Sequence, residues 1–353
     1  MRVSVIIPVY NMPSVQICVE QLYCSLSDED EIILVDDGSK DETGRVCDSL
    51  AGRYSRVRVF HQKNQGAAAA RNRGMAEASG RLIMFMDADD RIRPGMIKRI
   101  VTAFSEPAAP DLLMFCHSAS YYKGPILFRK EIRHLPTEGV ITIQDIVKRL
   151  YIFFECNALS PVWNKVYRKD ILDETGLLLN PSMTVYEDLD FTLRYLLCCR
   201  NIYCMNQIGY NYRIQENAGN TGKRMRRIEN IESVLDPIAA DLEMLAKVLT
   251  NDFPDSLHSC REEMNKIRCQ LFLILAREKL SVTNLRQMKD QCRKMRETLC
   301  RFPLRFADNI SENERRLISR IENNRYMEIY LERKYAALRH KAATIVKSVR
   351  ARK

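Results

Sequence analysis

One apolar segment that ends in a run of carboxylates constrains this chain more than any other feature. Residues 82–86 are apolar and of strand length, and Asp87, Asp89 and Asp90 come directly after them. A strand that is apolar on both faces is typical of the centre of a sheet covered by helices. In open α/β sheets, ligands bind at the carboxyl ends of the strands. Because hard divalent cations take oxygen ligands, Asp87 and Asp89 could hold one cation that bridges a diphosphate. The alternative is a structural turn and helix cap, a role that Asp also suits.

The first hundred residues alternate between apolar segments of strand length and segments with helical spacing. The expected strands are 3–9, 32–35, 57–60 and 82–86, and the expected helices are 15–26, 46–51 and 67–78. The short links between them predict an α/β fold with a Rossmann-like, mostly parallel sheet flanked by helices. Each strand ends in polar residues, so these residues would meet at one edge of the sheet.

The phosphate-binding motifs of two common nucleotide-binding classes are missing. The chain contains no GxGxxG and no GxxxxGK[ST] sequence. Their absence argues against a dinucleotide-dependent dehydrogenase and against a P-loop NTPase. A nucleotide diphosphate that is held through a metal ion and carboxylates remains compatible with the pattern.

Four segments of this region together resemble glycosyltransferase family 2. They are VSVIIPVYN at 3–11, EIILVDDGSKD at 31–41, NQGAAAARNRG at 64–74 and MFMDADD at 84–90, in that family's order and spacing. The resemblance implies the GT-A fold and transfer of a sugar, with inversion, from a nucleotide-diphosphate sugar. We expect a UDP-sugar as the donor.

The resemblance also implies a donor site with individual roles. Pro8 and Tyr10 would line the base pocket, and Arg71 would lie near the donor. Asp36 or Asp37 would pair with the pyrimidine edge. The remaining expected donor-site residues are Asn11, Gly66, Asp87, which would approach the ribose, and Ala88. Asp89, together with Asp87, would hold Mn²⁺ or Mg²⁺.

Structural alternatives remain open for several of these residues. Asp36 and Asp37 could form a turn before a helix, and Arg71 and Arg73 could be solvated residues on a helix surface. Asp90 could cap a helix that begins near Pro94, because Pro suits the first helical turn. A polar loop at 217–222 fits a lid, with Arg213 and Lys223 as possible phosphate contacts.

The middle of the chain is expected to complete this domain. Residues 112–122 and 126–134 are predicted to form strands, expected to pair in an antiparallel fashion, and Thr142 with Asp145 predicts a capping-box start to a helix reaching 154. The segments WNKVY at 163–167 and YEDLDF at 186–191 again resemble the family. Transfer of a sugar to a hydroxyl requires a base, and the positive end of a helix dipole keeps a carboxylate ionised. We assign that role to Asp188, with Glu187 as the second candidate; the alternative is an ordinary acidic first turn.

The charge of the chain is unevenly distributed. From Lys223 onward, the chain contains 29 Lys and Arg residues but only 18 Asp and Glu residues, whereas the preceding part is close to neutral. Apolar residues recur at spacings of three and four through this back part, including 331–349, which predicts helices with a bend or interruption at Pro237. We therefore expect a GT-A catalytic domain at 1–222 and a basic helical region at 223–353.

The basic helices have several possible partners. They could pack on the catalytic domain, form a homodimer or rest on the membrane surface through anionic lipid. Nucleic acid is not expected, because no DNA- or RNA-binding motif is recognisable. The twelve cysteines contain no CxxC pair, and the chain shows neither a signal-peptide pattern nor an apolar run of the roughly 20 residues that span a bilayer. These features favour reduced thiols and a cytoplasmic location, possible also on the cytoplasmic face of the membrane.

The expected function is transfer of a sugar from a nucleotide-diphosphate sugar to a hydroxyl of a glycan or lipid-linked acceptor in surface polysaccharide biosynthesis. One rival is a sugar-nucleotide pyrophosphorylase, which would need a glycine-rich and basic loop where residues 10–13 read YNMP. A second rival is a non-catalytic, transferase-like scaffold whose basic tail binds a membrane or a partner. The presence of Asp87, Asp89 and Asp188 argues against the scaffold.

Overall fold

The computed structural model describes residues 2–215, 231–252, 257–280, 284–301, 310–333 and 336. The chain divides into two compact units. The first comprises Met1–Asn220 with Pro237–Glu263, and the second comprises Thr221–Asp236 with Met264–Lys353. The possible lid at 217–222, Lys223 and most of the segment 331–349 lie outside the described residues.

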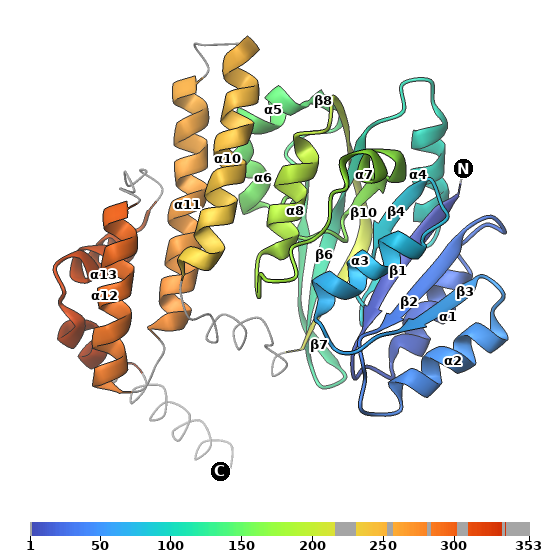
Figure 1. The fold of residues 1–353 in the computed structure, drawn as a ribbon, viewed down its shortest axis with the longest axis horizontal. Coiled ribbons are helices and arrows are strands. Elements are labelled where there is room, and N and C mark those ends of the chain that lie inside the picture. Colours follow the sequence, from blue (N-terminus) through green and yellow to red (C-terminus); the bar gives the residue numbers. More distant parts are fainter. Residues whose placement is uncertain are drawn as a thin grey trace. The chain divides into compact units, whose positions relative to one another are not determined.

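The first unit is built on one sheet, in which the described strands follow the order β3-β2-β1-β4-β9-β6-β10-β5 (Figure 1). Two further strands extend it, since β7 pairs with β6 and β8 pairs with β10. The strands are β1 Val3–Val9, β2 Glu31–Asp36, β3 Val57–His61, β4 Leu82–Phe85, β5 Arg91–Ile92, β6 Leu112–Lys123, β7 Ile126–Arg133, β8 Gly139–Thr142, β9 Lys165–Arg168 and β10 Asn201–Gln215.

The strand directions confirm the predicted fold class. The four strands β3, β2, β1 and β4 are mutually parallel, and β6 is parallel to β10. Strand β9 lies between these two groups and is antiparallel to both β4 and β6. The predicted strands 112–122 and 126–134 correspond to β6 and β7, which pair in an antiparallel fashion.

Helices cover both faces of the sheet. The helices are α1 Val15–Tyr23, α2 Thr43–Arg53, α3 Ala67–Glu77, α4 Met96–Ser105, α5 Ile143–Val147, α6 Leu150–Glu155, α7 Lys169–Thr175, α8 Glu187–Leu196, α10 Glu232–Asp252, α11 Leu257–Lys279, α12 Leu285–Arg301 and α13 Glu312–Glu322. Helices α1, α2 and α4 share one hydrophobic core with residues such as Val5 and Met84 of the sheet. On the other face, the Phe191 ring of α8 meets Phe85 and Tyr167 edge-on.

Helix α3 lies unusually close to β1. A Cβ atom at Gly74 would stand only 2.3 Å from Cγ2 of Ile6. Since Ile6 is fully buried in a central strand, it has little room to move away. The absence of a side chain at Gly74 therefore lets α3 approach the sheet and places Arg71, one turn earlier, over the carboxyl end of the strands.

Two predicted helical features differ from the structure. The capping box of Thr142 and Asp145 is confirmed, but the helix that was expected to reach 154 is divided into α5 and α6. The break lies at Arg149, whose φ of −127° and ψ of 25° are not helical. Of the bend or interruption expected at Pro237, the interruption is not seen, because α10 continues through this residue.

The first part of the back region belongs to the first unit. Residues 237–263 cluster with it rather than starting a separate region at 223. Glu263 accepts a hydrogen bond from the backbone N–H of Tyr151 at 3.0 Å. Asp241 of α10 is buried beside Asp190 of α8, and this burial together with the like charge of Asp190 raises the pKa of Asp241 to about 7. Residues 237–263 are therefore described with the first unit, and the expected domain boundary at 222 stays a prediction.

In the second unit, α12 and α13 bury apolar residues that recur at spacings of three and four. The buried residues are Met288, Cys292 and Met295 of α12 and Ile318 and Ile321 of α13.

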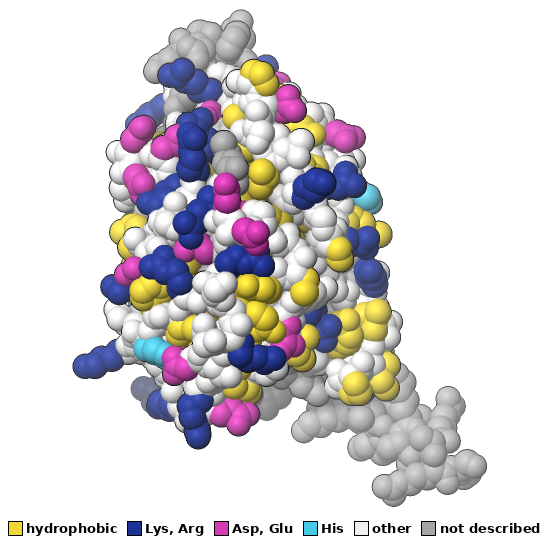
Figure 2. Space-filling view, turned by 90° about the vertical axis from the view of Figure 1, so that its right-hand side faces the viewer, with side chains coloured by type: hydrophobic (Ala, Val, Ile, Leu, Met, Phe, Trp, Pro, Cys, Tyr) yellow, Lys and Arg dark blue, Asp and Glu magenta, His cyan; other side chains and the backbone are white. Residues whose placement is uncertain are grey.

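Among the helices that the structure describes, none is both long and apolar enough to cross a membrane. Figure 2 shows the side of the molecule where β2, β3 and α2 lie, and basic and acidic side chains are interspersed there.

Candidate active site

The carboxylates after β4 form a turn that is tied to β10. The backbone N–H of Asp90 donates to the carbonyl of Asp87 at 3.1 Å. The Tyr210 hydroxyl accepts from the backbone N–H of Asp87 at 3.0 Å and donates to Asp90 Oδ2 at 2.8 Å. Asp90 Oδ1 accepts from the backbone N–H of Arg213 at 2.7 Å. The fully buried Asp90 therefore anchors the turn, and its expected alternative role as a helix cap is wrong.

Arg71 connects two acidic residues that are far apart in the sequence. Its Nη2 donates to Asp87 Oδ1 and its Nη1 donates to Asp188 Oδ1, both at 2.9 Å. Arg71 is only 5% exposed, so the alternative of a solvated helix residue is wrong for it. By contrast, the exposed Arg73 pairs with Glu77 at 2.8 Å on the surface of α3. The structure thus brings Asp87, Arg71 and Asp188, all predicted site residues, into direct contact.

The surroundings of Asp188 favour its protonated form more than those of an ordinary carboxyl. Asp188 is the second residue of α8. Burial raises the pKa of Asp188 to about 7, and the negative charges of Glu187 and Asp87 add to this rise against the opposing effect of Arg71. A carboxylate whose pKa lies near neutrality is suited to accept a proton during a reaction.

The loops after β1, β2 and β3 are held together by the predicted donor-site residues. Asn11, at φ 48°, donates its backbone N–H to Ser39 Oγ at 3.0 Å and accepts from the backbone N–H of Lys40 at 2.8 Å. Asp37 accepts from the backbone N–H groups of Gln65 and Gly66, each at 2.8 Å. These bonds position the loop that leads into α3.

Asp36 faces a different partner from Asp37. It accepts from the backbone N–H of Ser39 at 3.0 Å and lies 2.8 Å from Nδ1 of His61. Although burial opposes the shift, the hydrogen bonds from Ser39 and His61 lower the pKa of Asp36. Asp36 and Asp37 are both almost completely buried, so their carboxylates organise these loops from within.

The remaining predicted residues lie at the same edge with different exposure. Tyr10 is 43% exposed, Pro8 is partly buried and Ala88 is buried in the turn after β4. Asp89 follows in that turn, and burial together with the nearby charge of Asp87 raises the pKa of Asp89. Within the described residues, no group of three or more His, Cys, Asp or Glu side chains is arranged to hold a metal ion.

Comparison with known proteins identifies the family. The family model described as Glycosyl transferase family 2 matches residues 4–170. Glycosyltransferase GlyG from Streptococcus pneumoniae serotype 4 is 30% identical over 216 residues, which cover 60% of this chain and 70% of GlyG. EpsJ from Bacillus subtilis, described as an uncharacterized glycosyltransferase, is 27% identical over 297 residues, or 83% of each chain. The chain belongs to glycosyltransferase family 2.

A solved structure supports the same assignment at the level of the fold. TarS from S. aureus, in complex with UDP, superimposes with a TM-score of 0.65 at 17% identity, covering 96% of this chain and 92% of that chain. The fold of this glycosyltransferase is therefore GT-A-like, with helices after the catalytic unit.

Sequence reasoning assigned no role to Lys165, which lies near the base candidate of this glycosyltransferase. Lys165 is fully buried, and its Nζ donates to the Leu159 carbonyl at 3.2 Å, to Asn164 Oδ1 at 2.8 Å and to the Pro161 carbonyl. Burial lowers the pKa of Lys165 to about 7, against the opposing effect of Asp188. In the sequence, only its place in the family-like WNK segment at 163–165 indicated that Lys165 could lie near the candidate site.

The sequence analysis also did not predict a stack of aromatic rings beside the carboxylate turn. The Trp163 ring lies parallel to Tyr210, with centroids 4.5 Å apart, and Tyr212 stacks on it at 5.3 Å. Because Tyr210 binds both Asp87 and Asp90, this stack supports the carboxylate turn from the side of β10.

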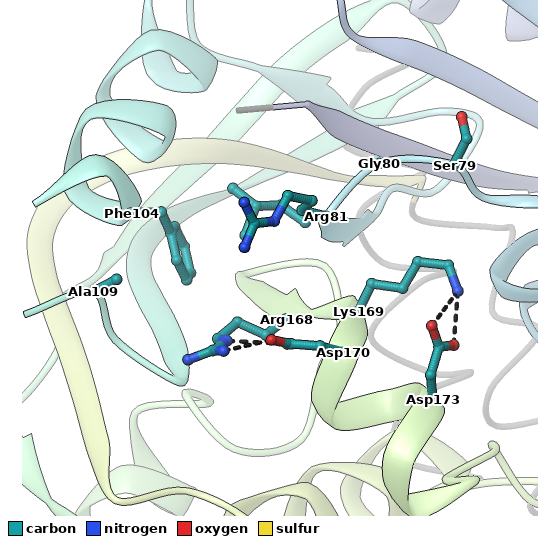
Figure 3. A pocket seen from close by; sticks show the side chains of 10 residues that line it. Ser79, Gly80, Arg81, Phe104, Ala109, Arg168, Lys169, Asp170 and Asp173 are labelled. Atoms are coloured by element: carbon teal, nitrogen blue, oxygen red, sulfur yellow. Dashed lines mark hydrogen bonds and ion pairs between the residues drawn. The ribbon is translucent and has the colours of Figure 1, made fainter.

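A separate cavity of about 330 Å³ lies at the amino end of β4, opposite the candidate site (Figure 3). Much of its charge is already paired, since Arg168 contacts Asp170 and Lys169 contacts Asp173 at 2.7 Å. The predicted donor-site residues do not line this cavity. This cavity is therefore separate from the candidate site at the carboxyl edge of the sheet.

Proposed function

We propose that this glycosyltransferase moves a sugar, with inversion, from a UDP-sugar to a hydroxyl group of a glycan or lipid-linked acceptor in surface polysaccharide biosynthesis. The observation that carries the proposal is the Arg71 bridge between Asp87 and Asp188. It joins a residue expected on the donor side to the residue expected to receive the acceptor proton. Such a site can place donor and acceptor next to one another.

In this proposal, Asp188 is the general base. Its position in the first turn of α8 and its contact with Arg71 hold the carboxylate in one orientation. It would take the proton from the acceptor hydroxyl as that oxygen attacks the anomeric carbon, while the bond to the nucleoside diphosphate breaks on the opposite face of the sugar. Glu187, the first residue of α8, is the second candidate for the same role.

The proposed metal ion is Mn²⁺ or Mg²⁺, held by Asp89 with Asp87. The pKa of Asp89 is raised by burial and by the nearby charge of Asp87, and a hydrogen bond from its own backbone N–H offsets this only in part. A divalent cation would offset this accumulation of negative charge, so the residues fit such an ion. When bound, it would stabilise the charge of the leaving diphosphate as a Lewis acid.

The proposed donor pocket lies over the loops after β1, β2 and β3. Tyr10 and Pro8 would contact the base, and Asn11, Asp36, Asp37, Gly66 and Ala88 would shape or line the pocket. The hydrogen bonds of Asp36 and Asp37 within these loops suggest that much of their contribution is to preorganise the pocket. We propose a uridine nucleotide first because TarS, which shares the fold, was solved with UDP and with UDP-GlcNAc.

Thermal unfolding in the presence of uridine and guanosine diphosphates, with and without Mn²⁺, tests the donor site. A ligand at about 100 times its dissociation constant adds about 2.7 kcal/mol to the free energy of unfolding. We expect a metal-dependent rise in Tm with UDP that is absent in Asp89→Ala. The exposed Asp28→Ala, which lies at the amino end of β2, serves as the matched control and should keep the rise.

Other results would point to the rival functions. No rise with any diphosphate, from a folded sample, would favour a transferase-like scaffold whose C-terminal helices bind a membrane or form a homodimer. A response to a nucleoside triphosphate alone would favour a pyrophosphorylase.

A further inference from the structure

The hairpin of β6 and β7 carries a row of exposed apolar side chains. On β7, Ile126 is 66% exposed, Leu127 47%, Phe128 52% and Ile132 49%. Within the described part of the chain, β7 pairs with β6 alone and is therefore an edge strand. Large apolar side chains that gather on one surface mark an interaction site more often than isolated ones do.

The same hairpin is basic. Residues 121–134 contain one acid and four cations, namely Glu131 with Lys123, Arg129, Lys130 and Arg133. Glu131 pairs with Arg129 and Arg133, whereas Lys130 makes no ion pair with the residues that the structure describes. Exposed apolar side chains next to an excess of cations form the surface chemistry that a bilayer with anionic lipids attracts.

The hairpin begins at the wall of the active site. Ser120 of β6 donates its hydroxyl to Asn211 Oδ1 of β10 at 2.7 Å. Arg213, whose backbone N–H holds Asp90, pairs with Ser120 in the ladder and donates from Nη1 to the Tyr122 hydroxyl at 3.3 Å. The tip of the hairpin lies beyond these contacts, at the end of the sheet that carries the catalytic residues (Figure 1). A partner of the hairpin would therefore lie near bound acceptor.

A second copy of β7 is a less suitable partner. In the antiparallel register that pairs the whole of β7 with itself, Arg129 of one copy would stand opposite Lys130 of the other, and this pair would occur twice. Like charges directly opposite one another destabilise a strand pair, and cations on an edge strand commonly prevent such pairing. The charge pattern of β7 favours an anionic partner.

We propose that the β6–β7 hairpin is a contact surface for a bilayer of anionic lipids, with Ile126 and Phe128 inserted among the headgroups and the cations of β7 beside them. This contact would hold the carboxyl edge of the sheet at the lipid surface. It does not depend on the identity of the donor or on the C-terminal helices.

Co-sedimentation of the full chain with vesicles tests the contact. We expect the wild-type chain to bind vesicles that contain phosphatidylglycerol more tightly than vesicles of phosphatidylcholine alone. The double substitution Ile126→Ser with Phe128→Ser should lower the partition coefficient at least about tenfold, because each buried methylene contributes strongly to membrane binding. Lys130→Gln should lower it about fivefold at low salt and less at high salt. Ile17→Ser removes an apolar side chain on α1 that is 56% exposed and should leave binding unchanged.

The outcomes separate this inference from its alternatives and from the proposed catalytic function. All variants must keep the wild-type Tm, and Asp188→Asn should bind vesicles as the wild type does. Equal binding by the double variant and the wild type would overturn the proposal and place any lipid affinity elsewhere on the chain. The proposal is also overturned if the wild type ignores phosphatidylglycerol, or if sedimentation shows a dimer that the hairpin substitutions dissociate.

Discussion

Carboxylates lie at both ends of the same sheet, Glu31 buried at the amino end and Asp188 partly buried at the carboxyl end, but the two have very different numbers of hydrogen-bond donors. At the amino end, Glu31 accepts from the Ser4 hydroxyl at 2.6 Å and from the Ser79 backbone N–H and hydroxyl at 2.8 and 2.7 Å. Arg2 and Arg58 each lie 3.1 Å from its other oxygen. At the carboxyl end, Asp188 forms an ion pair with Arg71 alone among the residues that the structure describes.

This difference appears in the proton affinities. Burial alone would raise the pKa of Glu31, but the hydrogen bonds from Ser4, Ser79 and Arg58 lower it to about 2. Burial raises the pKa of Asp188 to about 7 because Arg71 does not offset the lost hydration and the neighbouring acids. Glu31 is thus ionised at neutral pH and structural, whereas Asp188 can exchange a proton near neutral pH. A carboxylate left short of donors in a folded protein is a candidate for function.

Asp188→Asn should produce the largest effect on activity. The amide keeps an acceptor for Arg71 but cannot accept the proton, so kcat should fall about 10²- to 10⁴-fold while donor binding and Tm change little. The wild-type kcat/KM should rise with pH and level off above about pH 7, because the base must be deprotonated. The variant should lack this rise. Initial rates across pH, with donor binding measured in parallel, provide the test; full activity in Asp188→Asn would exclude it as the base and leave Glu187.

Glu31→Gln should have the opposite profile, with a large effect on stability and little effect on kcat. The lowered pKa corresponds to about 3 kcal/mol of stability at pH 7, as the Glu31 side chain is only 2% exposed. Because the pKa is lower in the folded state, this contribution is complete above about pH 5 and is lost as the pH falls towards 2.

Urea unfolding of Glu31→Gln and wild type at several pH values checks this expectation. Glu20→Gln is the matched control, since the Glu20 side chain is 38% exposed and its pair with Arg53 should contribute less than about 1 kcal/mol. A pH-independent difference between Glu31→Gln and wild type would show that the loss comes from packing rather than from the ionised carboxylate.

The sequence predicted which residues come together at the candidate site better than it predicted how they contact one another. The alternation of apolar strands and helices was sufficient to place Asp87 at the carboxyl edge, and the family-like segments pointed to Arg71 and Asp188. The sequence did not show that Arg71 joins Asp87 to Asp188, since the contact between Arg71 and Asp188 spans 117 positions. An apolar strand that ends in a polar residue gives the same sequence pattern whether that residue contacts a ligand or its own loop.

Asp90 and Lys165 illustrate that limit. Asp90 is buried because Tyr210 and Arg213, from a distant strand, supply its hydrogen bonds. Lys165 is buried because three acceptors in the preceding loop surround its ammonium group. Charged residues are rarely fully buried, so composition and periodicity favour a surface position for both. Only the fold brings in the partners that reverse this expectation.

The packing that positions Arg71 can be tested with a smaller effect, through Gly74. In a helix interior, Ala is favoured over Gly by about 1 kcal/mol, so Gly74→Ala would stabilise an isolated α3. In the folded protein the new Cβ would meet Cγ2 of the buried Ile6 at 2.3 Å, and overpacking of this kind costs about 1–3 kcal/mol. We expect a net loss of stability, together with lower activity as α3 and Arg71 move away from Asp87.

Gly52→Ala provides the matched control for this last comparison. Gly52 also lies within a helix, α2, but a Cβ there would meet no atom within 4 Å. This substitution should raise the free energy of unfolding by about 0.5 kcal/mol and leave kcat unchanged. If both glycine substitutions stabilise the protein, then α3 does not approach β1 as closely as described, and the packing of α3 on β1 cannot be what holds Arg71 between Asp87 and Asp188. If only Gly74→Ala is harmful, then the same close packing that supports the sheet also sets the geometry of the site.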